Sequence, residues 1–412
     1  MKYTVLTILI PLLIAATSLA ESPRFRGPSG DGHFTATGLL SSWPEGGPPV
    51  AWIAEGIGEG FSSVSVAGER LFVTGMDEEG QGRLFILDLQ GNKTGRIVYG
   101  PETPDAQAPG PRSTPTIDGD RAYLLSGLGV LYALDVSQQK GLWQVNILER
   151  FGGENITWSL AESPLLEGDT VICTPGGNDG VVVALNKMTG DTVWAMNDIR
   201  DRASYCSPVI ITHNGHRILV TMTATQVLGM DPGTGKLLWH HEHRTEYDIN
   251  AVSPVYGNGL LYCSSGYKSG GVALKLSDDG GAVTEAWTDK TLDCQHHGVV
   301  LVDGYIYGGA QRNSLVCLEL ATGEVMWDEK KISQADTVYA DGMLYVYEGP
   351  RKGVVSLIKP SPEGLDIQGQ LQVTAGTDKH WAHPTIAHGL LFIRHGDAVI
   401  AYDIRKKQRT RH

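Results

Sequence analysis

The chain has 412 residues, of which 19% are charged and 41% hydrophobic, and its formal net charge at pH 7 is −13. An acidic chain of this kind repels nucleic acid and anionic membranes, so we expect neither as a general partner. The 52 glycines favour a turn-rich all-β protein.

The first twenty residues predict a secretory signal peptide that is cleaved after Ala20. Met1-Lys2 precedes an apolar stretch from Val5 to Ala16, and Ser18-Leu19-Ala20 supplies the small residues of a cleavage site. The stretch is too short for a membrane-spanning helix. We therefore predict a periplasmic or secreted protein without a transmembrane segment, and the leader segment 21–47 is its first mature part.

From Ser62 onward the chain repeats one pattern about every 40 to 50 residues. One copy runs from Ser207-Pro208 through Met230-Asp231 and Thr234-Gly235-Lys236 to Trp239. Each copy contains four short apolar runs separated by turn residues, which predicts a four-stranded antiparallel sheet. Because one such sheet cannot bury both of its faces, we predict that the copies stack radially as a β-propeller.

A tryptophan closes most copies at one fixed place, which predicts packing between neighbouring blades and not a functional role. The glycine of the preceding Thr-Gly turn supplies the positive φ that a tight turn needs. These tryptophans are Trp143, Trp194, Trp239, Trp287 and Trp327.

The two ends of the repeat region complement each other. Residues 384–403 contain three strands of a last copy without its Trp strand, and Val50-Ala51-Trp52-Ile53 has the composition of that missing strand. We therefore predict an eight-bladed propeller over residues 48–405, in which the N-terminal strand closes the last blade. Residues 406–412 are predicted to be a solvated basic tail.

The five cysteines lie in different copies and include neither a Cys-x-x-Cys motif nor an adjacent pair. We expect mostly buried cysteines and no disulfide scaffold, and a single disulfide bridge stays an open alternative. They are Cys173, Cys206, Cys263, Cys294 and Cys317.

The repeat resembles that of the pyrroloquinoline-quinone (PQQ) propeller superfamily, as in the segment from Met230 to Trp239, and the likeness covers about residues 48–405. That superfamily includes quinoprotein alcohol dehydrogenases, which hold PQQ and calcium on the ring axis. It also includes the non-catalytic propeller of the outer-membrane β-barrel assembly machinery. The leader sequence from Phe25 to Gly32 resembles that of a group of exported PQQ-like propeller proteins.

The residues just ahead of each Ser-Pro position are expected to surround the mouth of the axial channel. Alignment of the copies places in one ring Phe61, Arg112, Ala161, Tyr205, Ala251, His297, Ala335 and Trp381. The candidates for binding a ligand there are Arg112, Trp158, Tyr205, His296, Trp381 and His383. The candidates for acid–base catalysis are Glu162, Asp336 and His297.

Two interpretations of these residues stay open. In the first, Arg112 binds a carboxylate or phosphate while Trp381 or Trp158 stacks on a planar ring. In the second, the charged groups pair with one another and fill a wet channel. We predict no metal site, because the adjacent His296 and His297 point to opposite sides of an extended chain.

The resemblance to the dehydrogenases implies parts that this chain lacks or only partly offers. A vicinal disulfide is absent, and the calcium ligands could only be Glu162, Asn155 and Asp336, with Trp158 as the floor under the quinone. We therefore predict a binding or protein-interaction scaffold in the bacterial envelope, whose partner is an envelope protein or a small polar ligand at the channel mouth. The alternatives are a PQQ- and calcium-dependent dehydrogenase that oxidises an alcohol or sugar, and an enzyme acting on an exported carbohydrate.

Overall fold

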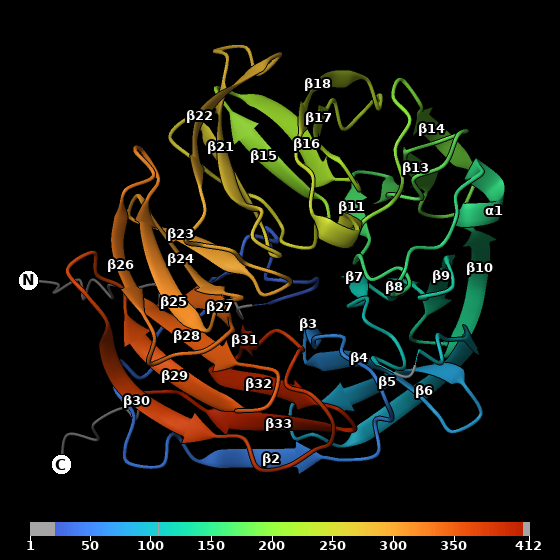
Figure 1. Cartoon of the computed structure of the whole chain (residues 1–412). Coiled ribbons are helices and arrows are strands. Elements are labelled where there is room, and N and C mark those ends of the chain that lie inside the picture. Colours follow the sequence, from blue (N-terminus) through green and yellow to red (C-terminus); the bar gives the residue numbers. More distant parts are fainter. Residues whose placement is uncertain (1–20, 106, 407–412) are drawn as a thin grey trace, which may run out of the picture.

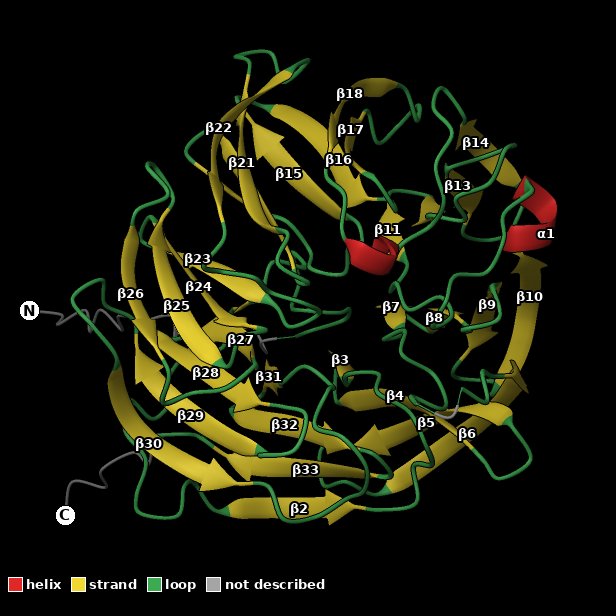
Figure 2. Ribbon diagram, viewed as in Figure 1, coloured by secondary structure: helices red, strands yellow, loops and turns green. Residues whose placement is uncertain are grey.

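The computed structural model describes residues 21–105 and 107–406, and there the chain forms eight sheets around one axis (Figures 1 and 2). Each sheet has four strands in antiparallel order, and one of them gains a fifth strand. The predicted all-β, eight-bladed propeller is confirmed. The predicted signal peptide and the tail from residue 407 onward lie outside the described residues.

The blades follow one another in chain order, with the first strand of each nearest the axis (Figure 1). The first blade consists of β3 (Ser65–Ala67), β4 (Arg70–Met76), β5 (Gln81–Asp88) and β6 (Lys93–Pro101), and the second of β7 (Thr116–Asp118), β8 (Arg121–Leu125), β9 (Val130–Asp135) and β10 (Lys140–Asn146). The third blade consists of β11 (Leu165–Glu167), β12 (Thr170–Cys173), β13 (Val182–Asn186) and β14 (Thr192–Met196), and the fourth of β15 (Val209–His213), β16 (His216–Met222), β17 (Gln226–Met230) and β18 (Leu237–Glu242). The fifth blade consists of β19 (Val255–Gly257), β20 (Leu260–Ser265), β21 (Gly270–Leu276) and β22 (Val283–Asp289), and the sixth of β23 (Val299–Val302), β24 (Tyr305–Ala310), β25 (Ser314–Glu319) and β26 (Val325–Glu329). The seventh blade consists of β27 (Ala335–Ala340), β28 (Met343–Glu348), β29 (Val354–Lys359) and β30 (Asp366–Gln372), and the eighth of β31 (Thr385–Ala387), β32 (Leu390–His395), β33 (Ala398–Asp403) and β2 (Val50–Ala54). The other elements of the described residues are β1 (His33–Phe34), the helix α1 (Ile147–Phe151) and the 3₁₀ turn η1 (Glu246–Asp248).

The predicted tryptophan packing between blades is confirmed at the perimeter of the ring. The indole N–H of Trp143 donates to the backbone oxygen of Lys187 in the next blade at 3.1 Å. A Cβ atom at Gly190 would lie 2.9 Å from the Trp143 ring, and Gly190 has a φ of +76°. The glycine is therefore needed for the turn and for the space. The same type of indole hydrogen bond to the next blade recurs at Trp239, Trp287 and Trp327.

Strand β2 forms the outer strand of the last blade, where it pairs antiparallel with β33. Trp52 lies opposite Ala401 in this register, and its indole N–H donates to Leu89 of the first blade at 2.8 Å. The blade is therefore completed by residues from both ends of the propeller region, which ties the ring together.

The leader segment crosses one end of the ring, behind the blades in the view of Figure 1. Its backbone pairs with the first blade at Ser22, and the Arg24 side chain donates to Pro208 in the fourth blade at 2.9 Å. Arg26 donates to Val299 in the sixth blade at 2.6 Å, and β1 then adds to β27 as a parallel fifth strand. Because these contacts span the ring, the leader covers one mouth of the axial channel, a surface that we call the leader face.

The seventh blade has no tryptophan on its outer strand, and a leader residue takes that place. Trp43 is buried against Tyr345, with ring centroids 6.0 Å apart, and it packs beside Gly369 of β30. All five cysteines are buried, as predicted for most of them, and all five are free. Within residues 21–105 and 107–406, no helix is long and apolar enough to cross a membrane.

Candidate functional site

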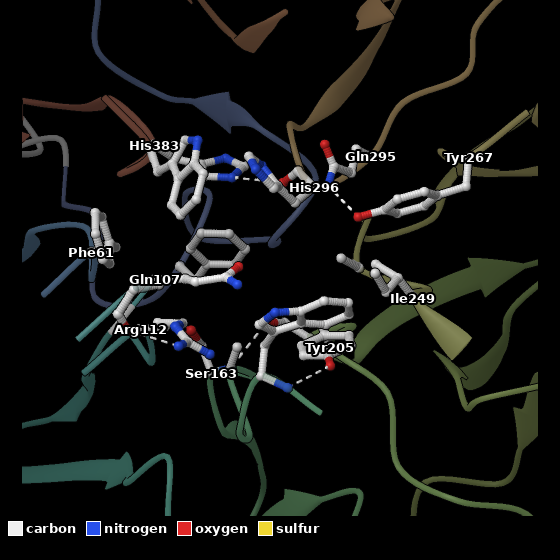
Figure 3. A pocket seen from close by; sticks show the side chains of 17 residues that line it. Phe61, Gln107, Arg112, Ser163, Tyr205, Ile249, Tyr267, Gln295, His296 and His383 are labelled. Carbon is white, nitrogen blue, oxygen red and sulfur yellow. Dashed lines mark hydrogen bonds between the residues drawn. The ribbon is translucent and has the colours of Figure 1, made fainter. Parts of the chain in front are cut away.

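A cavity of about 260 Å³ lies on the ring axis, at the end where the outer strand of one blade leads to the inner strand of the next (Figure 3). We call this end the loop face. All six predicted binding candidates line this cavity. Its lining consists of Phe25, Phe61, Gln107, Ala108, Arg112, Trp158, Ala161, Ser163, Tyr205, Ser207, Ile249, Ala251, Tyr267, Gln295, His296, Trp381 and His383.

Aromatic and imidazole rings form about half of the described lining, and several of them contact one another. The Trp381 ring lies 5.3 Å from that of Phe61 and 5.2 Å from that of His296, the latter in an edge-to-face geometry with an interplanar angle of 71°. The ring of Phe25, which the leader contributes, lies 4.7 Å from His383. Such packing fixes the rings in place and presents both edges and faces to the cavity.

Arg112 is already paired with a neighbouring carboxylate. Its Nη2 lies 3.2 Å from Oδ2 of Asp105 and donates to the backbone oxygen of Ala108 at 2.7 Å. Burial lowers the pKa of Arg112, and the carboxylate of Asp105 partly offsets this effect. Of the two interpretations of Arg112, the contacts favour the one in which the charges of the mouth pair with each other.

The two histidines of the wall are uncharged at neutral pH. Burial, with a smaller contribution from Arg112, lowers the pKa of His296 to about 4. Burial, followed by the charge of Arg26, holds the pKa of His383 well below its usual value. Nη1 of Arg26 lies 3.1 Å from Nδ1 of His383, which must accept, so the ring proton is on Nε2.

The three predicted acid–base residues do not line the cavity. Glu162, Asp336 and His297 are buried, with at most 1% of each residue exposed. Ala161 and Ser163 line the cavity while Glu162 between them does not, because successive residues of an extended chain point to opposite sides. His296 lines the cavity in place of the predicted His297, because these two adjacent side chains also point to opposite sides of the chain. A side chain that does not reach the cavity cannot exchange a proton directly with a ligand there.

Asp336 and Glu162 are instead parts of the wall behind the cavity. Oδ1 of Asp336 lies 3.1 Å from Nε2 of His383, and burial raises the pKa of Asp336 well above its usual value despite the nearby charge of Arg26. Oε1 of Glu162 accepts a hydrogen bond from the backbone N–H of Thr174 at 2.6 Å, and burial raises the pKa of Glu162 to about 7.

These residues do not fit a calcium-supported quinone site. Glu162 holds its proton up to near neutral pH, and the Asn155 amide donates to the backbone of Gly127 at 2.9 Å. Among the described residues, no three His, Cys, Asp or Glu side chains are grouped closely enough to hold a metal ion. Trp158, the candidate for the floor under a quinone, instead lies toward the rim, 6.0 Å from the largely exposed Tyr247.

Several residues of the site were not found from the sequence. Phe25 and Arg26 come from the leader, whose path under the ring has no strand pattern to reveal it. Tyr267 and Gln295 line the cavity from two different blades, and the Gln295 amide donates to the Tyr267 hydroxyl at 2.6 Å. Tyr267 lies in a turn with a φ of +60° instead of at the repeated Ser-Pro position.

The ring of eight repeats with its axial cavity places the chain among propellers built from PQQ-type repeats. The profile of the family described as outer membrane protein assembly factor BamB matches residues 50–329, and the chain belongs to this family. BamB of Moranella endobia (strain PCIT) is 24% identical over 233 residues, which are 57% of this chain and 48% of that relative. The chain therefore matches about half the length of that relative.

Solved structures repeat the same fold at low identity. BamB from Moraxella catarrhalis superposes with a TM-score of 0.62 and 16% identity, over 86% of this chain and 99% of that structure. The quinohemoprotein alcohol dehydrogenase from Comamonas testosteroni superposes with a TM-score of 0.66 and 12% identity, over 95% of this chain and 82% of that structure. Because scaffold and dehydrogenase share the ring, the likeness shows the fold alone.

Proposed function

We propose that this protein is an exported binding scaffold of the bacterial envelope, which holds a partner protein at the loop face of its ring. Its membership of the BamB family supports an envelope role, since the relatives are described as outer membrane protein assembly factors. The predicted signal peptide supports a periplasmic or secreted location.

The observation that carries the proposal is the state of the polar groups around the cavity. Arg112 is paired with Asp105, the Gln295 amide is bonded to Tyr267, and His296 is uncharged at neutral pH. Acid–base chemistry requires a titratable group that reaches the ligand, and the three candidates for that role lie behind the wall. The site therefore has the properties of a recognition surface.

Site-specific photo-crosslinking in cells with an intact envelope tests this proposal. A photoreactive phenylalanine analogue replaces Tyr247, which is 57% exposed beside the cavity. The matched control carries the analogue at Ala321, an exposed residue in the turn between β25 and β26, at the opposite end of the strands. We expect a discrete crosslinked envelope protein from position 247 alone. Equal crosslinking from both positions, or none from position 247, would contradict the proposal.

A titration with PQQ, in the presence and absence of calcium, separates the scaffold from the dehydrogenase. We expect no saturable binding, because the candidate calcium ligands Glu162 and Asn155 are engaged with the backbone. Saturable, calcium-dependent quenching of tryptophan fluorescence would contradict the scaffold function and support a PQQ-dependent dehydrogenase.

A further inference from the structure

We propose that the axial cavity is an anchor site for one uncharged aromatic side chain, presented by a loop of the partner protein. This inference rests on the scaffold function proposed above and names the chemistry by which the partner is held. Four features of the cavity carry it: its closed inner end, its size and walls, its lack of free charge, and its rim.

The cavity is closed at its inner end. Phe25 lines it from the leader, and the neighbouring Arg26 is bonded to Val299 and His383, which fixes this part of the leader across the axis. A ligand can therefore enter only from the loop face and cannot pass through the ring. This shape suits the tip of an inserted side chain better than a chain that threads the channel.

The size and the walls fit one ring. The volume of about 260 Å³ is below the roughly 300–1,000 Å³ of pockets that enclose whole drug-sized ligands. Aromatic side chains line it from several blades, among them Phe61, Tyr205 and Tyr267 (Figure 3). An inserted aromatic ring can pack edge-to-face against such rings, which adds about 0.5–1.5 kcal/mol per pair to the burial of apolar area.

The charges around the cavity select against charged ligands. Arg112 is the one Lys, Arg, Asp or Glu side chain in the described lining, and Asp105 already neutralises it. A carboxylate ligand would have to displace Asp105, and a cationic ligand would find no anion in the wall. A carbohydrate would find Gln295 and Tyr267 bonded to each other, so these two residues offer it fewer free polar partners.

The rim has the composition of a protein-binding hot spot. Tyr247 stands 57% exposed on a backbone with a φ of +64°, and its ring contacts both Trp158 and Tyr267 edge-to-face, at 6.0 and 5.7 Å. A left-handed conformation is costly for tyrosine, and such strain is concentrated at functional sites. On the rim, the ammonium group of Lys379 lies 4.5 Å from the Trp381 ring and bonds to the backbone of Gln107. An aromatic centre with a polar border is typical of protein interfaces.

Amino-acid amides that differ only in the side chain test the chemistry directly. The probe is N-acetyl-4-fluorophenylalaninamide, followed by fluorine NMR with the full mature chain, and the comparison compounds are the lysine, glutamate and leucine analogues. We expect saturable binding of the aromatic amide, about tenfold tighter than that of either charged amide. No saturable binding of the aromatic amide, equal binding of a charged amide, or preferential binding of methyl glucoside would overturn the proposal.

Two cavity-filling variants locate the binding. Ala251→Trp places an indole in the cavity, and Ala161→Leu fills less of it in case the larger residue disturbs the fold. The matched control is Ala321→Trp, which adds the same side chain at an exposed turn. We expect the affinity for the aromatic amide to fall about tenfold in either cavity variant and to stay within about twofold in the control. Unchanged affinity in both cavity variants would place the ring elsewhere and overturn the proposal.

The crosslinking experiment distinguishes failure of this inference from failure of the scaffold function. If Ala251→Trp abolishes the crosslink from position 247, the anchor and the scaffold both stand. If the crosslink persists unchanged in Ala251→Trp, the result supports the scaffold function and contradicts the aromatic anchor site.

Discussion

The perimeter of the ring and its axis differ in how far their residues repeat from blade to blade. At the perimeter one contact recurs in several blades: the indole N–H of Trp287 donates to Leu320 at 3.0 Å, as that of Trp327 donates to Ser361 at 2.9 Å. At the axis the equivalent positions of the blades differ, with Tyr205 in one and Trp381 in another. Stacking identical blades needs one packing solution, whereas a site on the axis is formed only once, so its residues are free to differ.

The largest expected effect comes from breaking the perimeter where the ring closes. Deletion of residues 22–56 removes β2 from β33 and β1 from β27, and it leaves the last blade with an open edge. We expect no cooperative thermal transition by circular dichroism, in contrast to the control chain that begins at residue 21. A deletion variant that melts at the temperature of the control would show that closure does not stabilise the ring.

Removal of one perimeter tryptophan is the next largest change. Trp239 is 6% exposed and its indole N–H donates to Gly280 in the next blade at 3.2 Å. We expect Trp239→Ala to lower the free energy of unfolding by about 3–5 kcal/mol, measured by urea denaturation. The matched axial variant is Tyr247→Ala, whose ring is 57% exposed and whose effect we expect to stay within about 0.5 kcal/mol. Equal losses in the two variants would abolish the distinction between perimeter and axis.

The wall behind the cavity makes stability depend on pH through Glu162. Burial raises its pKa from 4.5 to about 7, so between these values the unfolded chain releases a proton that the folded chain retains. The free energy of unfolding therefore falls as the pH rises through this window, by about 3 kcal/mol in total.

The variant Glu162→Gln keeps an acceptor for the Thr174 N–H and cannot ionise. Relative to this variant, the wild type is expected to lose stability between about pH 4.5 and 7, measured by urea denaturation at each pH. Glu45→Gln, on an exposed part of the leader, is the control. A constant difference between wild type and Glu162→Gln across the window would mean that Glu162 ionises normally in the folded protein.

The same contrast explains what the sequence could and could not predict. The perimeter repeats, so copies such as those around Trp143 and Trp239 predicted the blades, and the incomplete copies at the two ends of the repeat region predicted their number and the closing strand. At the axis, the alignment brought Arg112, Tyr205 and Trp381 to one cavity but did not say on which side of the chain Glu162 points. Alternation along the extended chain supplies that answer once Ala161 and Ser163 are known to face inward.

The leader could not be predicted in this way because it repeats nothing. Phe25 and Arg26 lie far in the sequence from their contacts at Val299 and His383, and no hydrophobic period relates them. Only the assembled ring shows that the leader covers one mouth and leaves the other open.

The smallest expected effect concerns the charge pair at the open mouth. Asp105 and Arg112 are partly buried and 3.2 Å apart, so an added anion competes with a carboxylate already in place. We expect wild type to bind benzoate weakly, and Asp105→Ala to bind it about tenfold more tightly, because the variant frees the Arg112 guanidinium. The double variant Asp105→Ala/Arg112→Ala serves as the control and is expected to lose this gain, in the same calorimetric titration. If Asp105→Ala binds benzoate no more tightly than wild type, the Arg112 guanidinium does not reach the bound ligand. The cavity is then neutral because Arg112 faces away from it, and not because Asp105 pairs with Arg112. A gain that disappears in the double variant would show that Asp105 keeps the Arg112 guanidinium occupied, which is the condition under which an uncharged ring is preferred in the cavity.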